Sequence, residues 1–151
     1  MSVLLTNSRS LKIPGVQKVR SEVDSVILLE ESGLKSLAGL RKIHSINCKR
    51  IYIAHDNPYL LCLIVIYISL FKRKKITLFF QELYDVYKRL FTVLKKTLKM
   101  VDQIIVPSYN RKVATELLYG YNGTVLILPN KRDPENSAQS INGADQFGYV
   151  Y

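Results

Sequence analysis

Short, largely apolar runs alternate with helix-like segments along most of this chain. The runs cover residues 3–6, 26–29, 51–54, 76–80, 104–106 and 125–128. Apolar runs of this length, without a polar residue at every second position, are typical of strands buried on both faces of a parallel sheet. Because helical segments separate them, we predict an α/β fold: one domain with a doubly wound, Rossmann-like parallel sheet of about six strands.

Helical signals fill most of the intervals between the runs. Apolar residues recur at helical spacing over residues 34–43 and 85–100, and Pro58 suits the first turn of an apolar helix. Another helix, capped by Ser108 or Asn110, is predicted to carry four apolar residues. These are Val113, Ala114, Leu117 and Leu118.

The first interval and the C-terminal segment differ from this pattern. Residues 8–24 are polar with a turn signal at Pro14-Gly15, so a helix there must be short or missing. From Lys131 onward the chain is polar and has no apolar periodicity. We therefore assign residues 1–130 to the domain and residues 131–151 to a loose tail.

The apolar run from Tyr59 to Phe71 is shorter than the about 20 residues that a membrane-spanning helix needs. We interpret it as a buried helix. The N-terminus lacks a basic segment followed by a long apolar one, so no signal peptide is expected and the chain is predicted to be cytoplasmic. Cys48 and Cys62 stand in no metal-binding spacing, and the chain has only two histidines. No metal site is therefore predicted.

Charge points to polyanionic partners. Lysine and arginine number 22 against 12 aspartate and glutamate, a formal net charge of +10. Five basic residues lie largely off the apolar stripe of the helix predicted over residues 85–100. They are Lys88, Arg89, Lys95, Lys96 and Lys99. We predict that they contact an anionic membrane surface, with a solvated helix face as the alternative. No nucleic-acid-binding motif accompanies the charge, so nucleic acid is not expected as a partner.

Polar residues directly follow most of the predicted strands. In a doubly wound sheet, ligands bind at the carboxyl ends of the strands. The residues at those positions are Asn7, His55, Asp56, Gln81, Glu82, Ser108 and Asn130. Carboxylates there could bind acceptor hydroxyls, and a carboxylate or histidine could accept a proton. Two other interpretations stay open: Asp56 caps the helix that begins at Pro58, and Glu82 begins its own helix, where a negative charge is favourable.

Four segments, taken in order, resemble the N-terminal, acceptor-side domain of group-4-like glycosyltransferases of the GT-B class. They are Ile51–Pro58, Ile76–Tyr84, Val101–Ser108 and Val125–Asn130, and the resemblance covers roughly residues 50–133. The chain departs from the family at Gln81, where the family has histidine, and at Lys131, where it has glycine.

The resemblance implies a glycosyltransferase of surface polysaccharide or lipopolysaccharide biosynthesis, of which this chain is the acceptor-side half. His55, Asp56 and Glu82 would then be catalytic. Asn7, Gln81, Ser108 and Asn130 would bind the acceptor. The nucleotide-sugar would be a co-substrate held by a separate domain or subunit, with no cofactor on this chain. A lipid-linked acceptor would bring the chain to the inner face of the cytoplasmic membrane.

Two other functions remain open at this point. The chain could be a truncated remnant of such an enzyme that folds without catalysing a reaction. It could instead be a basic module that binds anions or nucleic acid, because the net charge of +10 suits either.

Overall fold

The computed structural model describes residues 1–29, 48–72, 74–81 and 88–129. Six parallel strands form one sheet in the order β2-β1-β3-β4-β5-β6. The strands are β1 Ser2–Thr6, β2 Ser25–Leu28, β3 Arg50–Ala54, β4 Lys75–Phe79, β5 Gln103–Val106 and β6 Thr124–Ile127. The predicted Rossmann-like, single-domain α/β fold is thereby confirmed.

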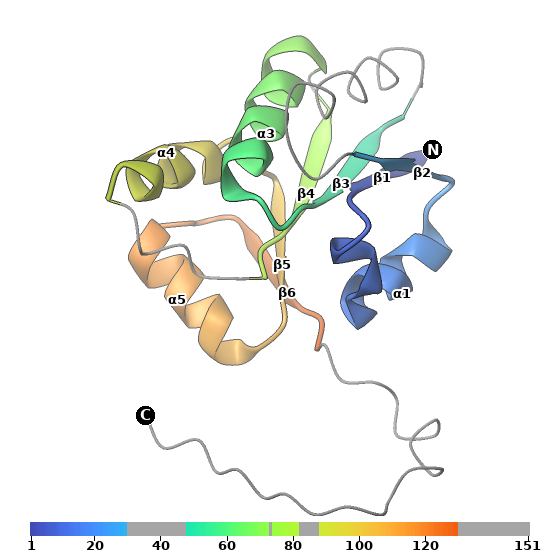
Figure 1. Ribbon diagram of the computed structural model, residues 1–151. Coiled ribbons are helices and arrows are strands. Elements are labelled where there is room, and N and C mark those ends of the chain that lie inside the picture. Colours follow the sequence, from blue (N-terminus) through green and yellow to red (C-terminus); the bar gives the residue numbers. More distant parts are fainter. Residues whose placement is uncertain (30–47, 73, 82–87, 130–151) are drawn as a thin grey trace, which may run out of the picture.

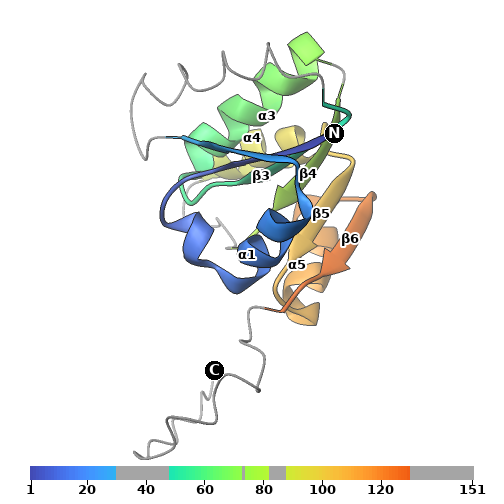
Figure 2. The ribbon, with the colours of Figure 1, turned by 90° about the vertical axis from the view of Figure 1, so that its right-hand side faces the viewer.

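Helices cover both faces of the sheet (Figure 1). The helices are α1 Pro14–Glu22, α3 Pro58–Lys72, α4 Lys88–Leu98 and α5 Tyr109–Tyr119, with the 3-10 turn η1 Ser10–Lys12 before α1. α3, α4 and α5 lie on one face, and α1 lies on the other (Figures 1 and 2). Two separate buried clusters correspond to these two faces.

Alternating strand residues feed the two clusters. Ile51 and Ile53 of β3 pack on the side of α3, whereas Ala54 packs on the other side against Val16 and Val19 of α1. Both faces of the central strands are thus buried, which explains why their sequences are continuously apolar. Within the part of the chain that the structure describes, no helix has the length and apolar character needed to cross a membrane.

The strand order reverses between β1 and β3. From β1 the chain moves outward to β2, and the later strands add successively on the opposite side of β1. Leu5 lies opposite Ile53 and Thr6 opposite Ala54 in the parallel register. The residues that follow, Asn7 and His55, therefore leave neighbouring strands at the reversal point, where doubly wound sheets open a crevice for ligands.

Two local features differ from the sequence-based expectations. Pro14 does not form a turn but opens α1, because the first turn of a helix does not need the N–H that proline lacks. In α5 the buried residues are Thr115 and Tyr119, while Leu117 is 77% exposed. The Tyr119 ring packs at 5.2 Å from that of Phe80, and this aromatic contact determines which side of the helix faces the core.

Some predicted elements lie outside the described residues. These are the helix over residues 34–43, the first residues of the helix predicted over 85–100, and the tail over 131–151.

Ser108 caps α5, as one of the two predicted alternatives had it, since its side chain accepts a hydrogen bond from the backbone N–H of Arg111.

Replacing Gly123 by Ala should destabilise the domain by roughly 2 kcal/mol, within the range for overpacked sites. A Cβ at this position would overlap the ring of Tyr121, which is buried and whose hydroxyl donates to the carbonyl of Val101 at 3.1 Å. Urea unfolding measures the loss. Asn122→Ala, at an exposed neighbouring position, is the control; equal stability of the two variants would contradict the expectation.

Stability above about pH 10 should depend on Tyr121. Burial, and secondarily the charge of Asp102, raises the pKa of Tyr121 to about 12. The unfolded phenol has a pKa of about 10, so the folded state holds this proton longer. The contribution of Tyr121 is therefore complete below about pH 10 and is lost as the pH rises towards about 12. The difference in unfolding free energy between the wild type and Tyr121→Phe should shrink between about pH 9 and about pH 11. A difference that stays constant would contradict the raised pKa.

Candidate functional site

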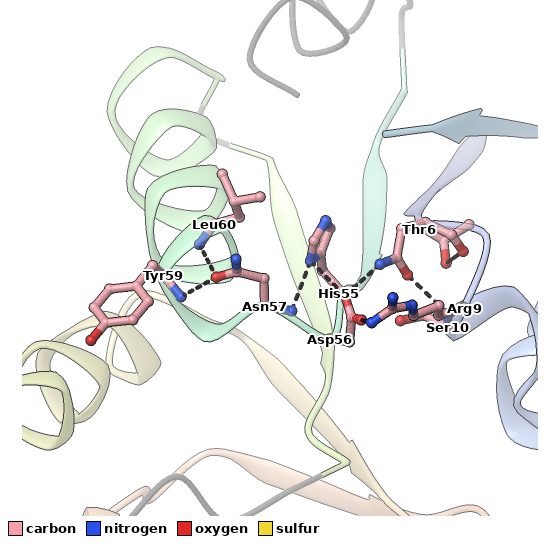
Figure 3. Close-up of polar contacts among 9 residues, drawn as sticks. Thr6, Arg9, Ser10, His55, Asp56, Asn57, Tyr59 and Leu60 are labelled. Carbon is pink, nitrogen blue, oxygen red and sulfur yellow. Dashed lines mark hydrogen bonds and ion pairs between the residues drawn. The ribbon is translucent and has the colours of Figure 1, made fainter. Parts of the chain in front are cut away.

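The side chains of Asn7 and Asp56 are in contact at the reversal point of the sheet. Figure 3 shows the polar contacts around Asp56. The side-chain amide of Asn7 donates a short hydrogen bond to Oδ1 of Asp56. The other end of the same amide, Oδ1, accepts the backbone N–H of Ser10 at 2.9 Å. Asn7 is completely buried, so its two bonds join the ends of β1 and β3 to the turn that precedes α1. Two of the candidate residues are thus in direct contact.

Asn57 caps α3, a role that the sequence left open for Asp56. Its side-chain oxygen accepts the backbone N–H groups of Tyr59 at 3.0 Å and Leu60 at 3.3 Å. With Pro58 at the first helical position, this is the usual geometry of an Asn N-cap. Since Asn57 satisfies the helix end, the Asp56 carboxylate is available for a different role.

His55 supports the turn from β3 into α3. The backbone N–H of Asn57 donates to Nδ1 of His55 at 3.0 Å. A backbone N–H can only donate, so Nδ1 is the unprotonated nitrogen, and a neutral ring carries its proton on Nε2. Oδ1 of Asp56 lies 3.4 Å from Nδ1, an approach that becomes an ion pair only if the ring is protonated. The His55 side chain is 0% exposed, so an acceptor in solvent does not reach it in this arrangement.

Asp56 is partly open to solvent, unlike the buried Asn7 and His55. Its side chain is 37% exposed, and its Oδ2 lies 3.7 Å from the guanidinium of Arg9, which is 71% exposed. An ion pair this open contributes little to stability, because water and salt screen it. Its effect is local: one carboxylate oxygen of Asp56 is held by Asn7, while the other lies near the exposed guanidinium of Arg9.

Arg9 and Asn57 were not among the site residues predicted from the sequence. Arg9 stands in the loop directly after β1. Ligands bind at the ends of the strands in a doubly wound fold, so a basic residue in this loop indicated a possible ligand contact. Asn57 directly before Pro58 was also recognisable as an N-cap, because asparagine ranks with aspartate at that position.

The remaining candidates are less closely joined to Asp56. Gln81 follows β4, the neighbour of β3, and is partly exposed. Ser108 follows β5, one strand further, and its hydroxyl accepts the N–H of Arg111 at 3.4 Å. Strands are about 4.8 Å apart, so Ser108 stands about 10 Å along the edge from the end of β3. Glu82 and Asn130 lie outside the described residues.

Four of the five predicted membrane-surface residues belong to α4, and Lys99 directly follows it. Lys95, Lys96 and Lys99 are all exposed. Lys88 and Arg89 belong to the first turn of α4, but their side chains are not among the described ones. α4 follows β4 on the face of the sheet opposite α1.

A groove of about 350 Å³ lies on the α1 face of the sheet. It runs from Lys18 and Glu22 of α1 past Tyr52 to Leu126 of β6. Its described lining includes none of the candidate residues, so it is separate from the Asn7–Asp56 contact. Among the residues that the structure describes, no group of three or more His, Cys, Asp or Glu is placed to hold a metal ion.

Replacing Asn7 by Asp should destabilise the domain more at neutral than at acid pH. The new carboxylate would face that of Asp56, and two like charges in contact raise one of their pKa values. A raised folded pKa makes stability fall as pH rises above the unfolded pKa of about 4. We expect Asn7→Asp to lose roughly 2 kcal/mol more at about pH 7 than at about pH 4, measured by urea unfolding.

Asn7→Ala is the matched control. It leaves the N–H of Ser10 unpaired and should cost about 1–3 kcal/mol at both pH values, because it adds no charge. If Asn7→Asp shows the same pH profile as Asn7→Ala, the contact between residues 7 and 56 does not have the described geometry.

Comparisons with protein-family models, with curated proteins and with solved structures find no match for this chain. No family is therefore shown for it. The fold and the Asn7–Asp56 contact stand on the structure, and the likeness to glycosyltransferases stands on the four sequence segments alone.

Proposed function

We propose that this chain is the acceptor-side domain of a GT-B-like glycosyltransferase that builds a surface polysaccharide or lipopolysaccharide. The observation that carries the proposal is the partly exposed Asp56 carboxylate, held by Asn7 where the strand order reverses. In open α/β sheets this is the place where ligands bind. The four family-like segments support the same function and include the turn that holds Asp56.

Asp56 is the group that meets the acceptor in this proposal. A hydroxyl of the acceptor donates to its exposed oxygen, which both fixes the nucleophile and draws its proton towards the carboxylate. Asn7 and His55 act as positioning residues: Asn7 fixes one carboxylate oxygen, and His55 fixes the turn through Asn57. Glu82, Gln81, Ser108 and Asn130 remain candidates for further acceptor contacts.

Arg9 gives the crevice its preference for a phosphorylated acceptor. Its guanidinium is largely exposed beside Asp56 and matches the geometry of a phosphate group. A lipid-diphosphate-linked sugar would present a hydroxyl to Asp56 and phosphate oxygens to Arg9. The nucleotide-sugar donor is assigned to a second domain or subunit, and the complete enzyme acts at the inner face of the cytoplasmic membrane.

The acceptor site can be tested by calorimetric titration with a short-chain prenyl-diphosphate sugar in detergent. Asp56→Asn should weaken binding at least about tenfold, since a hydrogen bond to a charged group contributes about 1.5–3 kcal/mol. Glu116→Gln is the control, because Glu116 is a partly exposed carboxylate on α5 that pairs with Lys112. UDP- and GDP-sugars should give no binding heat with this chain alone.

Two results would contradict the proposal. Tight binding of a nucleotide-sugar by this chain would overturn the assignment of the donor to another domain. Equal affinity of Asp56→Asn and the wild type for the acceptor would remove Asp56 from the site. If the wild type binds neither ligand, the inactive remnant becomes the better description.

A further inference from the structure

An apolar stripe runs along the solvent side of α3. Tyr59, Leu63 and Leu70 are 56%, 50% and 65% exposed. Spacings of four and seven residues place these side chains above one another on one side of a helix. The opposite side of α3 is buried, with Leu61, Ile64 and Ile68 in the core. α3 therefore has apolar residues on its outer side as well as on its core side, which an ordinary surface helix does not.

α4 extends this apolar surface. α3 and α4 pack against each other, and the thiol of Cys62 on α3 interacts with the hydroxyl of Thr97 on α4. Val93 precedes Thr97 by four residues, so it lies on the side of α4 that borders α3. Met100 stands in the turn directly after α4, and both residues are exposed. α4 and the turn after it thus add exposed apolar residues to those of the neighbouring α3.

Lysines accompany these apolar residues. Lys95 and Lys96 are exposed on α4, and Lys99 is exposed directly after it, close in sequence to Val93 and Met100. Neither α3 nor α4 contains an aspartate or glutamate. We call the set of Tyr59, Leu63, Leu70, Val93, Met100 and the three lysines the α3/α4 face. This face combines exposed apolar side chains with three positively charged ones.

We propose that the α3/α4 face docks on the surface of an anionic lipid bilayer. Contiguous exposed apolar side chains mark interaction surfaces, and apolar residues beside lysines match the boundary between acyl chains and head groups. The leucines enter that boundary while the lysines contact lipid phosphates. The inference deepens the proposed function by naming the surface that holds the chain at the membrane. It rests on the proposed function only in assuming that the acceptor is linked to a lipid.

Charge decides between a bilayer and a second copy of the chain. Two copies joined through this face would bring their lysine rows together, and each chain carries a net charge of +10. Like charges in an interface oppose association. An anionic leaflet instead supplies the complementary charge over the whole width of the face.

Vesicle co-sedimentation of the full chain tests the inference. The probes are phosphatidylcholine vesicles and vesicles with about one third phosphatidylglycerol. Each lysine near an anionic surface contributes about a fivefold factor, so three should favour the anionic vesicles roughly a hundredfold. Leu63→Asp/Leu70→Asp should lower binding to anionic vesicles at least about tenfold, and Lys96→Glu/Lys99→Glu roughly thirtyfold.

Matched controls exist elsewhere on the chain. Leu117→Asp/Leu118→Asp changes two exposed leucines of α5, and Lys12→Glu/Lys18→Glu changes two exposed lysines near or on α1. Both controls should keep most of the wild-type binding to anionic vesicles. Circular dichroism verifies that every variant is folded.

Several outcomes overturn the inference. The wild type could bind neutral and anionic vesicles equally, or bind neither. The leucine variants could also bind like the wild type, which would mean that the chain adsorbs by charge and inserts no side chain. Failure of the acceptor titration leaves this result untouched, because vesicle binding needs neither donor nor acceptor. Conversely, a chain that binds acceptor in detergent but ignores vesicles would contradict the docking face alone.

Discussion

The parallel pairing of β1 with β3 is the contact on which the rest of this structure depends. It places β1 inside the sheet, with β2 on one side and the later strands on the other. The register, with Thr6 opposite Ala54, then brings the two strand ends level. Because Asn7 and Asp56 follow these ends, the register brings their side chains within hydrogen-bonding reach.

The candidate site therefore owes its geometry to buried groups more than to exposed ones. Asn7 and His55 are inside the protein, and each uses a polar atom to fix backbone or carboxylate positions. Such buried polar side chains are costly unless they are satisfied, so they hold the turn rigidly. Asp56 and Arg9 are left at the surface of this frame, where they can exchange water for a ligand.

The sheet could be predicted from sequence because burial on both faces leaves a plain pattern. Six apolar runs corresponded to six strands, and Pro58 marked the start of α3. The rotation of α5 could not be predicted, since Leu117 and Leu118 are apolar yet exposed. It depends on Tyr119 meeting Phe80, a contact between residues 39 positions apart (119 − 80).

The candidate site was predicted in part for a similar reason. Residues that follow strands can be listed from the sequence, so Asn7, His55 and Asp56 were found. Which of them touches solvent depends on how the neighbouring side chains bury each residue. That burial is three-dimensional, and no local pattern in the sequence encodes it.

The position of β1 between β2 and β3 also has a consequence for synthesis on the ribosome. β1 is made before β3, so the pairing of the two strands waits until residues 50–54 have emerged. During that interval Val3, Leu4 and Leu5, all buried in the finished sheet, have at most β2 as a partner. Closing a loop of this length costs entropy before any contact compensates for it. Until β3 is made, the apolar residues of β1 are thus open to aggregation and to capture by chaperones.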